Sequence, residues 1–592
     1  MSPISANARQ PSTVTEDDTG KTKPRRFKVD EYRTLFTERC SSCKFWFLKL
    51  AVLIIICCLA LTLAFSSSIY IEQPWHSSYR HQPANVSHLW RKTFADPRYA
   101  SDSVVNWEKI SQITKDIVLG GNPRIGLLNF NCSEVRLWHQ TLRQAEFSSL
   151  NLDYADANTT WETLYPGWIN EGEKNKIPTC PTLPEPEMVK GFTFDLVAVK
   201  LPCNRSGRWS RDVARLHLQL AAAKIAEASS RVHVLLVTDC LPLPNLFTCK
   251  NLVRHEGNFW LYKPEIASLR EKIRLPVGSC ELSIPFEAKV RMYTEVGRRE
   301  AYATVLHSAE HYACGAIAAA RSIRASGSVR DLVVLVDEGV TDHDRRGLEA
   351  AGWKVKTMQR IRNPKAKRGT YNEWNYSKFR LWQLTDYDRV VFIDSDLLIL
   401  RNIDFLFALP EVSAAANNAD IFNSGLMVLE PSNCTFQLLM DRIQEITSYN
   451  GGDQGYLNEI FTWWHRVPRN MNYLKFFTAD DRRDTEMAKK NVLFGNDPPA
   501  LYVIHYLGKK PWICFRDYDC NWNVQSNWRF ASDEAHATWW RMHDLLPENL
   551  QKYCLLPAKF KAILESDRRQ AEKDNYPDGH WRRNITDPRQ HI

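Results

Sequence analysis

The sequence predicts an α/β protein with a mostly parallel central sheet, preceded by a second α/β region and by one membrane-spanning helix near the N-terminus. Apolar runs with strand character alternate with helical patterns in the C-terminal half, a weaker alternation precedes them, and one long apolar run lies near the N-terminus. With 592 residues, 44% of them apolar and 24% charged, the chain is long enough for more than one core. We therefore expect two globular regions after a membrane anchor.

The N-terminal segment has the pattern of a cytosolic tail followed by a signal anchor. Residues 1–44 are polar and charged, whereas residues 45–70 hold an apolar run in which Lys49 is the one charge. Such a run is long enough to cross a hydrocarbon layer of about 30 Å. Lys and Arg precede the run and are absent from Ser66–His76, so the positive-inside rule places the N-terminus in the cytosol and the rest of the chain in a lumen.

Glycosylation signals and cysteines agree with a lumenal location. Asn-x-Ser/Thr sequons begin at Asn85, Asn131, Asn158, Asn204, Asn375, Asn433 and Asn584. Eleven of the fifteen cysteines follow the apolar run, where an oxidising compartment permits disulfides. Their pairing cannot be assigned, although the closeness of Cys514 and Cys520 is suggestive, and zinc is disfavoured because these two have no C-x2-C partner set after the apolar run.

The net charge gives no support to nucleic-acid binding. Of the formal +9, residues 1–49 carry +4, so only +5 is spread over the remainder. A chain whose residues after 49 carry only +5 in total lacks the electrostatic signature of a nucleic-acid partner.

The lumenal part divides into four segments. Residues 71–118, rich in Ser, Pro, His and Trp, form a stem, and residues 119–290 form an α/β region whose role the sequence does not reveal. In that region we expect strands at 195–200 and 232–238 and an amphipathic helix at 213–228. Residues 298–532 form the main α/β domain and residues 533–592 a helical C-terminal tail.

The main domain shows the alternation most clearly. We expect strands at 302–307, 331–337, 389–393, 426–429 and 501–504 and helices at 313–324, 342–351 and 376–384. Alternation of this kind predicts a mainly parallel sheet with helices on its faces, in which ligands bind beyond the carboxyl ends of the strands.

Two carboxylates follow one of these strands directly. The run Arg389–Ile393 leads into Asp394-Ser395-Asp396, where both acids could reach one hard divalent cation. The same D-x-D spacing starts at Asp342, Asp386 and Asp517, but only Asp394 follows a continuous β-branched and aromatic run. A solvated turn is the competing interpretation for this motif taken alone.

Three later segments strengthen the cation interpretation. Phe422-Asn423-Ser424-Gly425 precedes an apolar strand, and its glycine would allow close backbone approach to a ligand. Gly451-Gly452-Asp453-Gln454-Gly455 opens a helix, so Asp453 and Gln454 would point from a helix N-terminus into the site, although Asp453 could serve only as a cap. His505, at the end of another strand, offers an imidazole, and Lys509 and Lys510 offer charge for phosphates.

These residues resemble glycogenin and the other members of glycosyltransferase family eight, over about 302 to 512. The motifs stand in the family's order at Tyr312, Ser377–Trp382, Asp394–Asp396, Phe422–Gly425, Gly451–Gly455 and His505–Trp512. The resemblance implies a GT-A type nucleotide-sugar-binding fold and a transferase that retains anomeric configuration.

The resemblance also implies roles for individual residues. Asp394, Asp396 and His505 would bind Mn²⁺, Lys378 and Lys510 would neutralise donor phosphates, and Lys378, Asp453 and Gln454 would be the catalytic set. The implied substrate-binding residues are Tyr312, Lys378, Asp394, Ser395, Asp396, Asn423, Ser424, Gly425, Asn450, Gly451, Gly452, Asp453, Gln454, His505, Tyr506, Leu507, Gly508, Lys509 and Lys510. No covalent nucleophile can be assigned.

Within the family, the anchor, the long lumenal region and the stretch His505–Trp512 look like the plant glucuronosyltransferases of the GUX class. That resemblance implies a UDP-glucuronate donor, a xylan acceptor and a Golgi type II membrane protein, and it leaves open an oligomer or a complex with other Golgi transferases. Residues 474–500 hold no tyrosine, unlike the comparable connection of glycogenin, which disfavours self-priming. A UDP-glucose-dependent glucosyltransferase and a non-catalytic glycan-binding protein of the same fold remain the alternatives.

Two further features are left open. The run Lys365–Arg368, or Arg380, could pair with a glucuronate carboxylate, but a solvated basic loop explains the run equally well. Six tryptophans could stack on a polysaccharide, although such residues are more often core: Trp374, Trp463, Trp464, Trp512, Trp522 and Trp528.

Overall fold

The computed structural model describes residues 96–589, except for 172–179, 188–192, 205–208, 230, 285–296, 308–311, 418–419 and 479–483. The chain divides after Lys92, and every described residue lies in the second unit, Thr93–Ile592. The expected cytosolic tail, the anchor at 45–70 and most of the stem lie outside the described residues. Among the residues that are described, no helix combines the length and apolarity needed to cross a bilayer.

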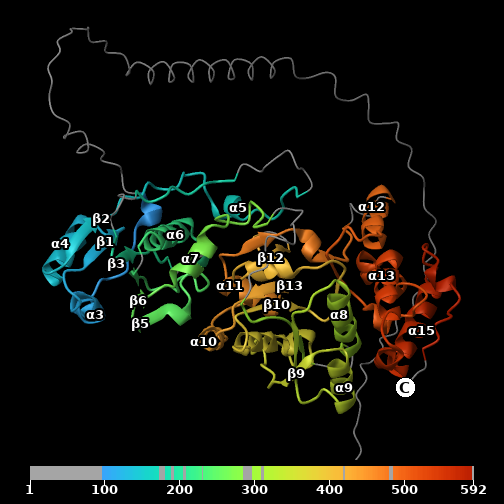
Figure 1. The fold of residues 1–592 in the computed structure, drawn as a ribbon. Coiled ribbons are helices and arrows are strands. Elements are labelled where there is room, and N and C mark those ends of the chain that lie inside the picture. Colours follow the sequence, from blue (N-terminus) through green and yellow to red (C-terminus); the bar gives the residue numbers. More distant parts are fainter. Residues whose placement is uncertain are drawn as a thin grey trace, which may run out of the picture. The chain divides into compact units, whose positions relative to one another are not determined.

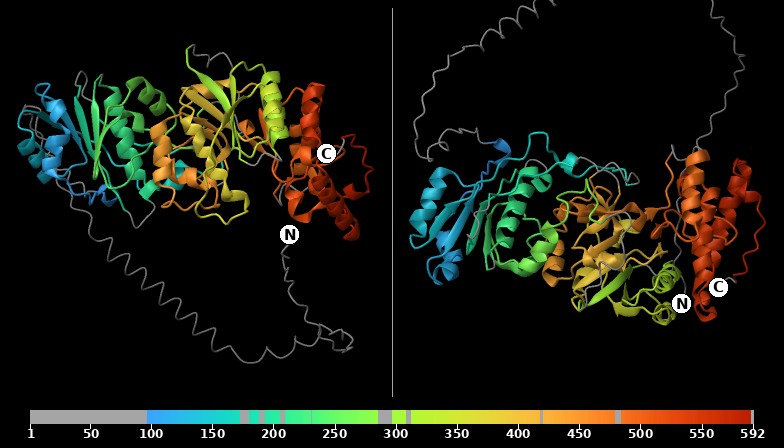
Figure 2. Two further views of the ribbon diagram at one scale, coloured as in Figure 1. Left: turned by 90° about the horizontal axis from the view of Figure 1, so that it is seen from below. Right: turned by 45° about the horizontal axis from the view of Figure 1, so that its top comes forward.

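The first region is a mixed sheet covered by helices on both faces (Figures 1 and 2). Its strand order is β2 (Glu146–Ser149), β1 (Arg124–Leu128), β3 (Leu196–Lys200), β4 (His233–Val237), β6 (Phe259–Tyr262) and β5 (Leu252–Glu256). The first four are mutually parallel, and β6 and β5 add an antiparallel hairpin. The helices of this region are α2 (Trp107–Ile113), α3 (Lys115–Val118), α4 (Cys132–Thr141), α5 (Trp161–Leu164), α6 (Val213–Glu227) and α7 (Ile266–Ile273), with short 3-10 helices η1 (Pro97–Tyr99), η2 (Trp209–Arg211) and η3 (Cys249–Asn251).

Side-chain alternation along the strands explains the two helical layers. In β3, Leu196 and Ala198 face the layer that contains Trp138 of α4, whereas Val197 and Val199 face α6. All but three of the fifteen residues of α6 are buried. The prediction of an amphipathic helix here was therefore wrong, because α6 is buried over nearly its whole surface, with only Val213, Lys224 and Glu227 partly exposed.

The second region is built on a seven-stranded sheet. Its order is β14 (His465–Val467), β12 (Ser413–Ala416), β13 (Phe422–Leu429), β10 (Arg389–Ile393), β7 (Glu300–Leu306), β8 (Asp331–Val336) and β9 (Lys354–Thr357). The helices α8 (Ala313–Ala325) and α9 (Asp342–Ala350) cover one face, and η7 (Asn375–Gln383), α10 (Asn433–Asp441) and α11 (Asp453–Ile460) pack on the other. The predicted segment at 376–384 is thus a 3-10 helix.

This sheet is mostly parallel, as predicted, but it is mixed because it contains one antiparallel strand, β13. β13 pairs antiparallel with both β10 and β12, while the other pairings within the described part of the sheet are parallel. The reason is the short connection from β12 to β13, which permits only a hairpin, since a parallel partner needs a long crossover. Phe422–Gly425, predicted to precede a strand, begins β13 itself.

A small third sheet and a helical C-terminal segment complete the fold. The third sheet has the order β11 (Leu397–Ile399), β16 (Val503–His505) and β15 (Tyr473–Leu474). The remaining elements are η6 (Tyr371–Glu373), η8 (Asp404–Ala408), η9 (Arg469–Met471), α12 (Asp484–Gly495), η11 (Pro511–Ile513), η12 (Cys520–Asn523), η13 (Gln525–Phe530), α13 (Asp533–Asp544), α14 (Glu548–Gln551), η14 (Lys552–Cys554), α15 (Ala558–Lys573) and η15 (His580–Arg582). A disulfide from Cys314 of α8 to Cys554 ties this segment to the second region.

The two regions share one hydrophobic core. A single cluster of buried side chains runs from α6 and the first sheet to Phe392 of β10 and to Trp463 and Trp464. A disulfide joins Cys249 to Cys434, and Arg211 pairs with Asp420 at 2.8 Å. The first region is therefore packed and covalently bonded to the second.

Five disulfides use ten of the eleven cysteines of the described residues. They join Cys180 to Cys280, Cys203 to Cys240, Cys249 to Cys434, Cys314 to Cys554 and Cys514 to Cys520. Cys132 is the free one and is exposed. This pattern fits a chain that folds in an oxidising compartment.

Candidate functional site

Two carboxylates and one imidazole converge where three strands end or begin. Asp394 follows β10 directly, Asp396 precedes β11, and His505 ends β16. Because β11 and β16 pair with Leu397 opposite His505, the imidazole is brought beside Asp396. One ligand atom from each of these side chains lies within 4.8 Å of the others. The geometry is that of a three-ligand site for a divalent cation.

Gly425 makes room for His505. The Asp394 amide donates to the Gly425 carbonyl at 2.8 Å, which brings β13 against the end of β10. A Cβ at position 425 would lie 2.5 Å from Cε1 of His505. The glycine was expected to admit a ligand, whereas in the structure the group that approaches it is the imidazole of His505.

A chain of buried amides orients that imidazole. His505 Nδ1 lies 3.0 Å from Oδ1 of Asn472, whose own Nδ2 donates to Oδ1 of Asn423 at 2.8 Å. The Asn423 oxygen also accepts the Gly425 amide at 2.9 Å. Since an amide oxygen can only accept, Nδ1 of His505 carries the proton and Nε2 presents its lone pair toward Asp396, 3.6 Å away.

Burial keeps this imidazole neutral. It lowers the pKa of His505 to about 4, against the attraction of Asp396. A neutral ring is the form that binds a metal ion, so His505 is competent over the whole physiological range.

Two buried lysines balance three carboxylates at the site. Lys510 Nζ lies 2.6 Å from Oδ2 of Asp396, and Lys378 Nζ lies 2.6 Å from Oδ2 of Asp453 and 3.4 Å from Oδ1 of Asp394. Desolvation raises the pKa of Asp394, with Asp396 and Asp453 adding to the rise against Lys378. Three acids facing two bases leave a negative cluster that a cation would neutralise.

Asp453 and Gln454 are held by Ser424. Asp453 is the first residue of α11, and its Oδ2 accepts the Ser424 hydroxyl at 2.9 Å. The Ser424 amide donates to Oε1 of Gln454 at 3.1 Å. Both side chains thus come from the helix N-terminus and lie on the β13 side of the site, next to Lys378.

Other predicted residues fall around this centre. Tyr312 is the N-cap of α8, and its ring meets Trp512 edge-on at 6.0 Å. Asn450 stabilises the loop that leads into α11, since its Oδ1 accepts hydrogen bonds from the amides of Gly452 and Gly455. The main-chain carbonyl of Gly451 accepts from Asn363.

The stretch after β16 is divided between the site and the C-terminal segment. Tyr506 turns its hydroxyl to the Ala535 carbonyl, while its amide donates to the carbonyl of Asp396. Lys509 pairs with Asp567 of α15 and not with the site carboxylates. Ser395 is buried within the D-x-D turn, Leu507 is half-buried, and Gly508 has a positive φ of 77°.

Lys365 and Arg380, which were considered as partners for a glucuronate carboxylate, already contact other groups of the protein. Lys365 donates to the Ile446 carbonyl and to Thr447, and Arg380 lies over the ring of Phe436. Trp463, Trp464 and Trp512 are fully buried, in agreement with the core interpretation. The sequon residue Asn375 is buried as well, so the folded protein offers no room for a glycan there.

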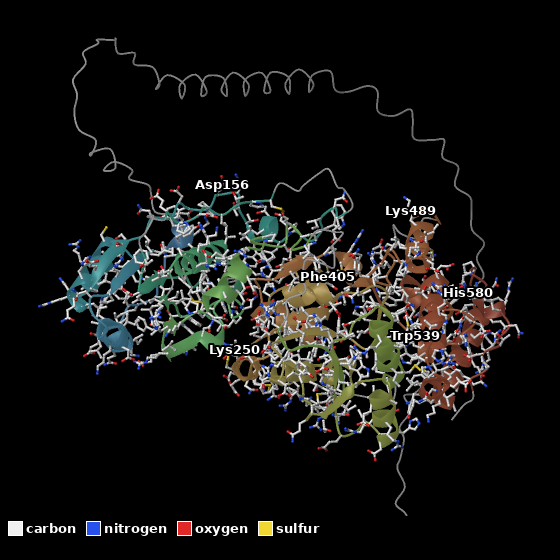
Figure 3. All side chains as sticks on the ribbon, viewed as in Figure 1. Asp156, Lys250, Phe405, Lys489, Trp539 and His580 are labelled. Carbon is white, nitrogen blue, oxygen red and sulfur yellow. A yellow bond between two sulfur atoms is a disulfide. The ribbon has the colours of Figure 1, made fainter. Side chains whose placement is uncertain are left out.

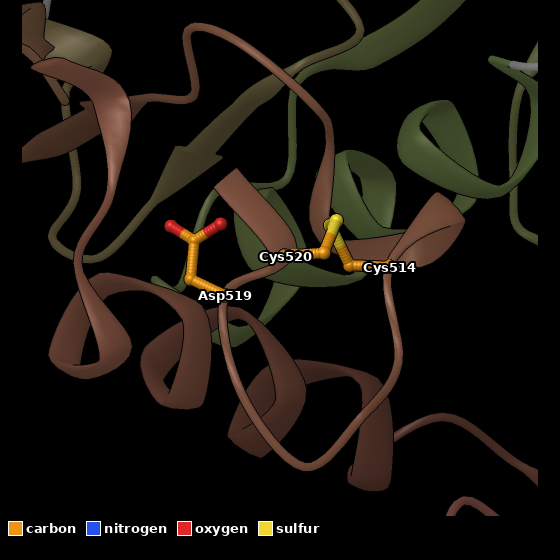
Figure 4. A group of neighbouring side chains, drawn as sticks. All are labelled: Cys514, Asp519 and Cys520. Carbon is orange, nitrogen blue, oxygen red and sulfur yellow. A yellow bond between two sulfur atoms is a disulfide. The ribbon is translucent and has the colours of Figure 1, made fainter. Parts of the chain in front are cut away.

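Sequence reasoning missed Asn472, because it belongs to no motif and acts through His505. A second group with metal-ligand chemistry, Cys514, Asp519 and Cys520, does not offer thiolates, since its sulfurs are bonded to each other (Figure 4). Asp519 instead forms a fully buried ion pair with Lys475 at 2.6 Å.

The comparisons with known proteins match both regions. Residues 97–280 match the GUX1-5 N-terminal domain, and residues 303–514 match Glycosyl transferase family 8. UDP-glucuronate:xylan alpha-glucuronosyltransferase 1 of Arabidopsis thaliana is 54% identical over 93% of this chain and 83% of its own length. A relative numbered 3 in the same Arabidopsis series is 60% identical over 83% of this chain and 81% of its own. A solved structure of the galactosyltransferase LgtC with donor and acceptor sugar analogues covers 43% of this chain and 99% of that one, at 16% identity and a TM-score of 0.30.

Proposed function

The chain belongs to the UDP-glucuronate:xylan alpha-glucuronosyltransferases within glycosyl transferase family 8, and we propose that it transfers glucuronate from UDP-glucuronate to the backbone of xylan with retention of anomeric configuration. The observation that carries this function is the convergence of Asp394, Asp396 and His505 beside two buried lysines. A nucleotide-sugar donor needs its diphosphate neutralised, and this cluster supplies the means.

The proposed cofactor is Mn²⁺. Two carboxylate oxygens and one neutral imidazole nitrogen form a donor set that suits a divalent transition metal, and the excess of acids over bases leaves it a charge to neutralise. Asp394, Asp396 and His505 would hold the ion, which when bound would stabilise the charge of the departing UDP.

The remaining site residues would neutralise the phosphates of the donor and position its sugar. Lys510 and Lys378 are held against carboxylates at 2.6 Å, so their charges are fixed in place before a donor arrives. Asp453 lies beside Lys378, and Gln454 is oriented by the Ser424 amide. In this proposal these two side chains face the transferred sugar, and catalysis is mainly electrostatic and positional.

We also propose that the protein is a single-pass Golgi membrane protein whose catalytic region is lumenal. The apolar run at 45–70 and the charge asymmetry around it support the orientation. The disulfides of the described residues support an oxidising lumen.

The test is release of UDP by the purified full-length protein with Mn²⁺ and xylohexaose, comparing UDP-glucuronate with UDP-glucose. We expect release with UDP-glucuronate that is lost in Asp394→Ala, and a product carrying one added uronate by mass spectrometry. Release with UDP-glucose alone would establish the glucosyltransferase instead. Glycan binding without release from either donor would establish a non-catalytic glycan-binding protein.

A further inference from the structure

The first region contains a cleft that the catalytic site does not use. Its volume is about 490 Å³, within the range of ordinary ligand sites. It lies at the carboxyl ends of the parallel strands β1 and β3, bounded by Leu128 and Lys200, which is where α/β sheets bind their ligands. Its remaining walls come from the segment 96–101, the start of α4 and the segment 150–154.

Charged groups in the cleft neutralise each other. Lys200 Nζ pairs with Oε1 of Glu134 at 2.6 Å, and Arg98 pairs with Asp96 at 2.7 Å. The cleft therefore presents no excess charge of either sign from these side chains. This contrasts with the catalytic site, where three acids face two bases.

The N-terminus of α4, which borders the cleft, is not arranged to bind a phosphate. The side chain of Asn131 accepts the amides of Ser133 and Glu134, and the Glu134 carboxylate accepts the Asn131 amide in return. These are the amides a phosphate would need, and a carboxylate in the first turn repels an anion. A nucleotide or sugar phosphate is thus disfavoured, and an uncharged ligand is favoured.

Two tyrosines and several uncharged polar groups line the cleft. Tyr154 is 39% exposed, and its ring lies against that of buried Tyr99, with ring centroids 4.6 Å apart. Ser101 and Asn129 add a hydroxyl and an amide, whose oxygens are the atoms left to accept from a ligand, because the Ser101 hydroxyl donates to the Leu201 carbonyl and the Asn129 Nδ2 to two other carbonyls. A partly exposed aromatic face next to hydroxyl and amide groups is the chemistry that binds a sugar ring, which has apolar C–H faces and a hydroxylated edge.

The cleft is also preorganised. Asn129 adopts a positive φ of 63°, a conformation that asparagine tolerates better than most residues, and its Nδ2 donates to the carbonyls of Tyr99 and Lys200. Next to the cleft, Arg98 of the segment 96–101 donates to the carbonyl of Asp156, a residue labelled in Figure 3 that follows the segment 150–154. The walls are thereby fixed to each other, so little ordering is needed on binding.

We propose that this cleft binds a neutral oligosaccharide and serves as a docking site for the acceptor glycan. The identity of that glycan as unsubstituted xylan rests on the proposed function, whereas the existence of a neutral-glycan site does not. The first region would then hold the polysaccharide while the second modifies it.

The test is calorimetric titration of xylohexaose into the full-length protein in EDTA, with no donor present. Removing the exposed ring in Tyr154→Ala should weaken the affinity at least about tenfold, Tyr154→Phe should retain it, and Trp168→Ala, which removes an aromatic that is 67% exposed elsewhere, should leave it unchanged. Thermal melts of all variants check folding. Equal affinities in wild type and Tyr154→Ala would overturn the proposal, as would Tyr154-dependent binding of UDP or inorganic phosphate.

A parallel titration of Asp394→Ala separates this site from catalysis. We expect its affinity for xylohexaose to equal that of wild type. If no donor supports transfer but Tyr154-dependent glycan binding persists, the proposed function fails and the docking site stands. If transfer occurs while the affinity for xylohexaose is the same in wild type and Tyr154→Ala, the proposed docking site is wrong and the proposed function is retained.

Discussion

Replacing Asn472 with leucine should weaken the proposed metal site without removing a ligand. Asn472 is 3% exposed, accepts from Nδ1 of His505 at 3.0 Å and donates to Oδ1 of Asn423 at 2.8 Å. Leucine has the same branched heavy-atom skeleton and no acceptor, so the imidazole would lose the partner that fixes its tautomer and rotation. Outer-shell partners of this kind typically change metal affinity 10- to 100-fold, or about 1.4–2.7 kcal/mol.

The assay is titration of Mn²⁺ followed by electron paramagnetic resonance of the free ion, with the Mn²⁺ dependence of UDP release as a second readout. Asn472→Asp is the control for the acceptor, because its carboxylate still accepts from Nδ1 of His505 while, like leucine, it loses the donation to Oδ1 of Asn423. We expect Asn472→Asp to bind within a few-fold of wild type and Asn472→Leu to bind about 10- to 100-fold more weakly. His505→Ala should be weaker still.

A dissociation constant for Asn472→Leu within twofold of wild type would refute the reasoning, provided that His505→Ala binds more weakly. Binding that is equally strong in all variants would instead show that His505 is not a ligand. A wild-type protein that binds no Mn²⁺ would remove the metal site itself.

Three other predictions test charge, cross-linking and protonation. Lys378→Met should lower kcat for UDP release by about 100-fold or more, because it removes the cation between two site carboxylates, with a thermal melt as the check on folding. Cys249→Ser should lower the free energy of unfolding by about 2–4 kcal/mol in a denaturant titration, whereas Cys132→Ser should change little because that thiol is free and exposed. Burial lowers the pKa of His580, but hydrogen bonds, first that to Asp533 at 3.0 Å, outweigh burial and raise it. The resulting stability is present below about pH 6.5, the ordinary pKa of histidine, and is lost as the pH rises through the higher pKa of the folded state. The melting temperature of wild type should therefore fall toward that of His580→Gln as the pH is raised above about 6.5, and a constant difference would contradict this.

The parts of the fold that the sequence predicted are those with a local signal. The run Arg389–Ile393 is uniformly apolar or β-branched apart from its first residue, and the structure has it as β10 with all five residues buried. The location of Asp394 and Asp396 could be predicted from that strand, because the residues that directly follow a strand lie at the edge of the sheet. His505 was likewise found from its place after an apolar run.

The parts that were missed depend on contacts between distant residues. The direction of β13 is decided by a short connection and a neighbour, neither of which appears in its apolar pattern. Nothing in the sequence around Asn472 indicates its role, because that role depends on its contact with His505. The helix at 213–227 looked amphipathic only because polar Arg215, His217 and Gln219 interrupt it, and all three are buried with hydrogen-bond partners.

The shared core has a consequence for how this enzyme can be engineered. Trp463 and Trp464, which belong to the catalytic half, are each only 1% exposed, and Trp463 donates its indole N–H to the Val277 carbonyl. An excised catalytic half would carry these rings into water, along with an unpaired Cys434. Transplanting it onto another stem, or exchanging it with a relative's, therefore means transplanting residues 97–280 with it, and donor specificity in this group has to be redesigned on the whole two-region scaffold.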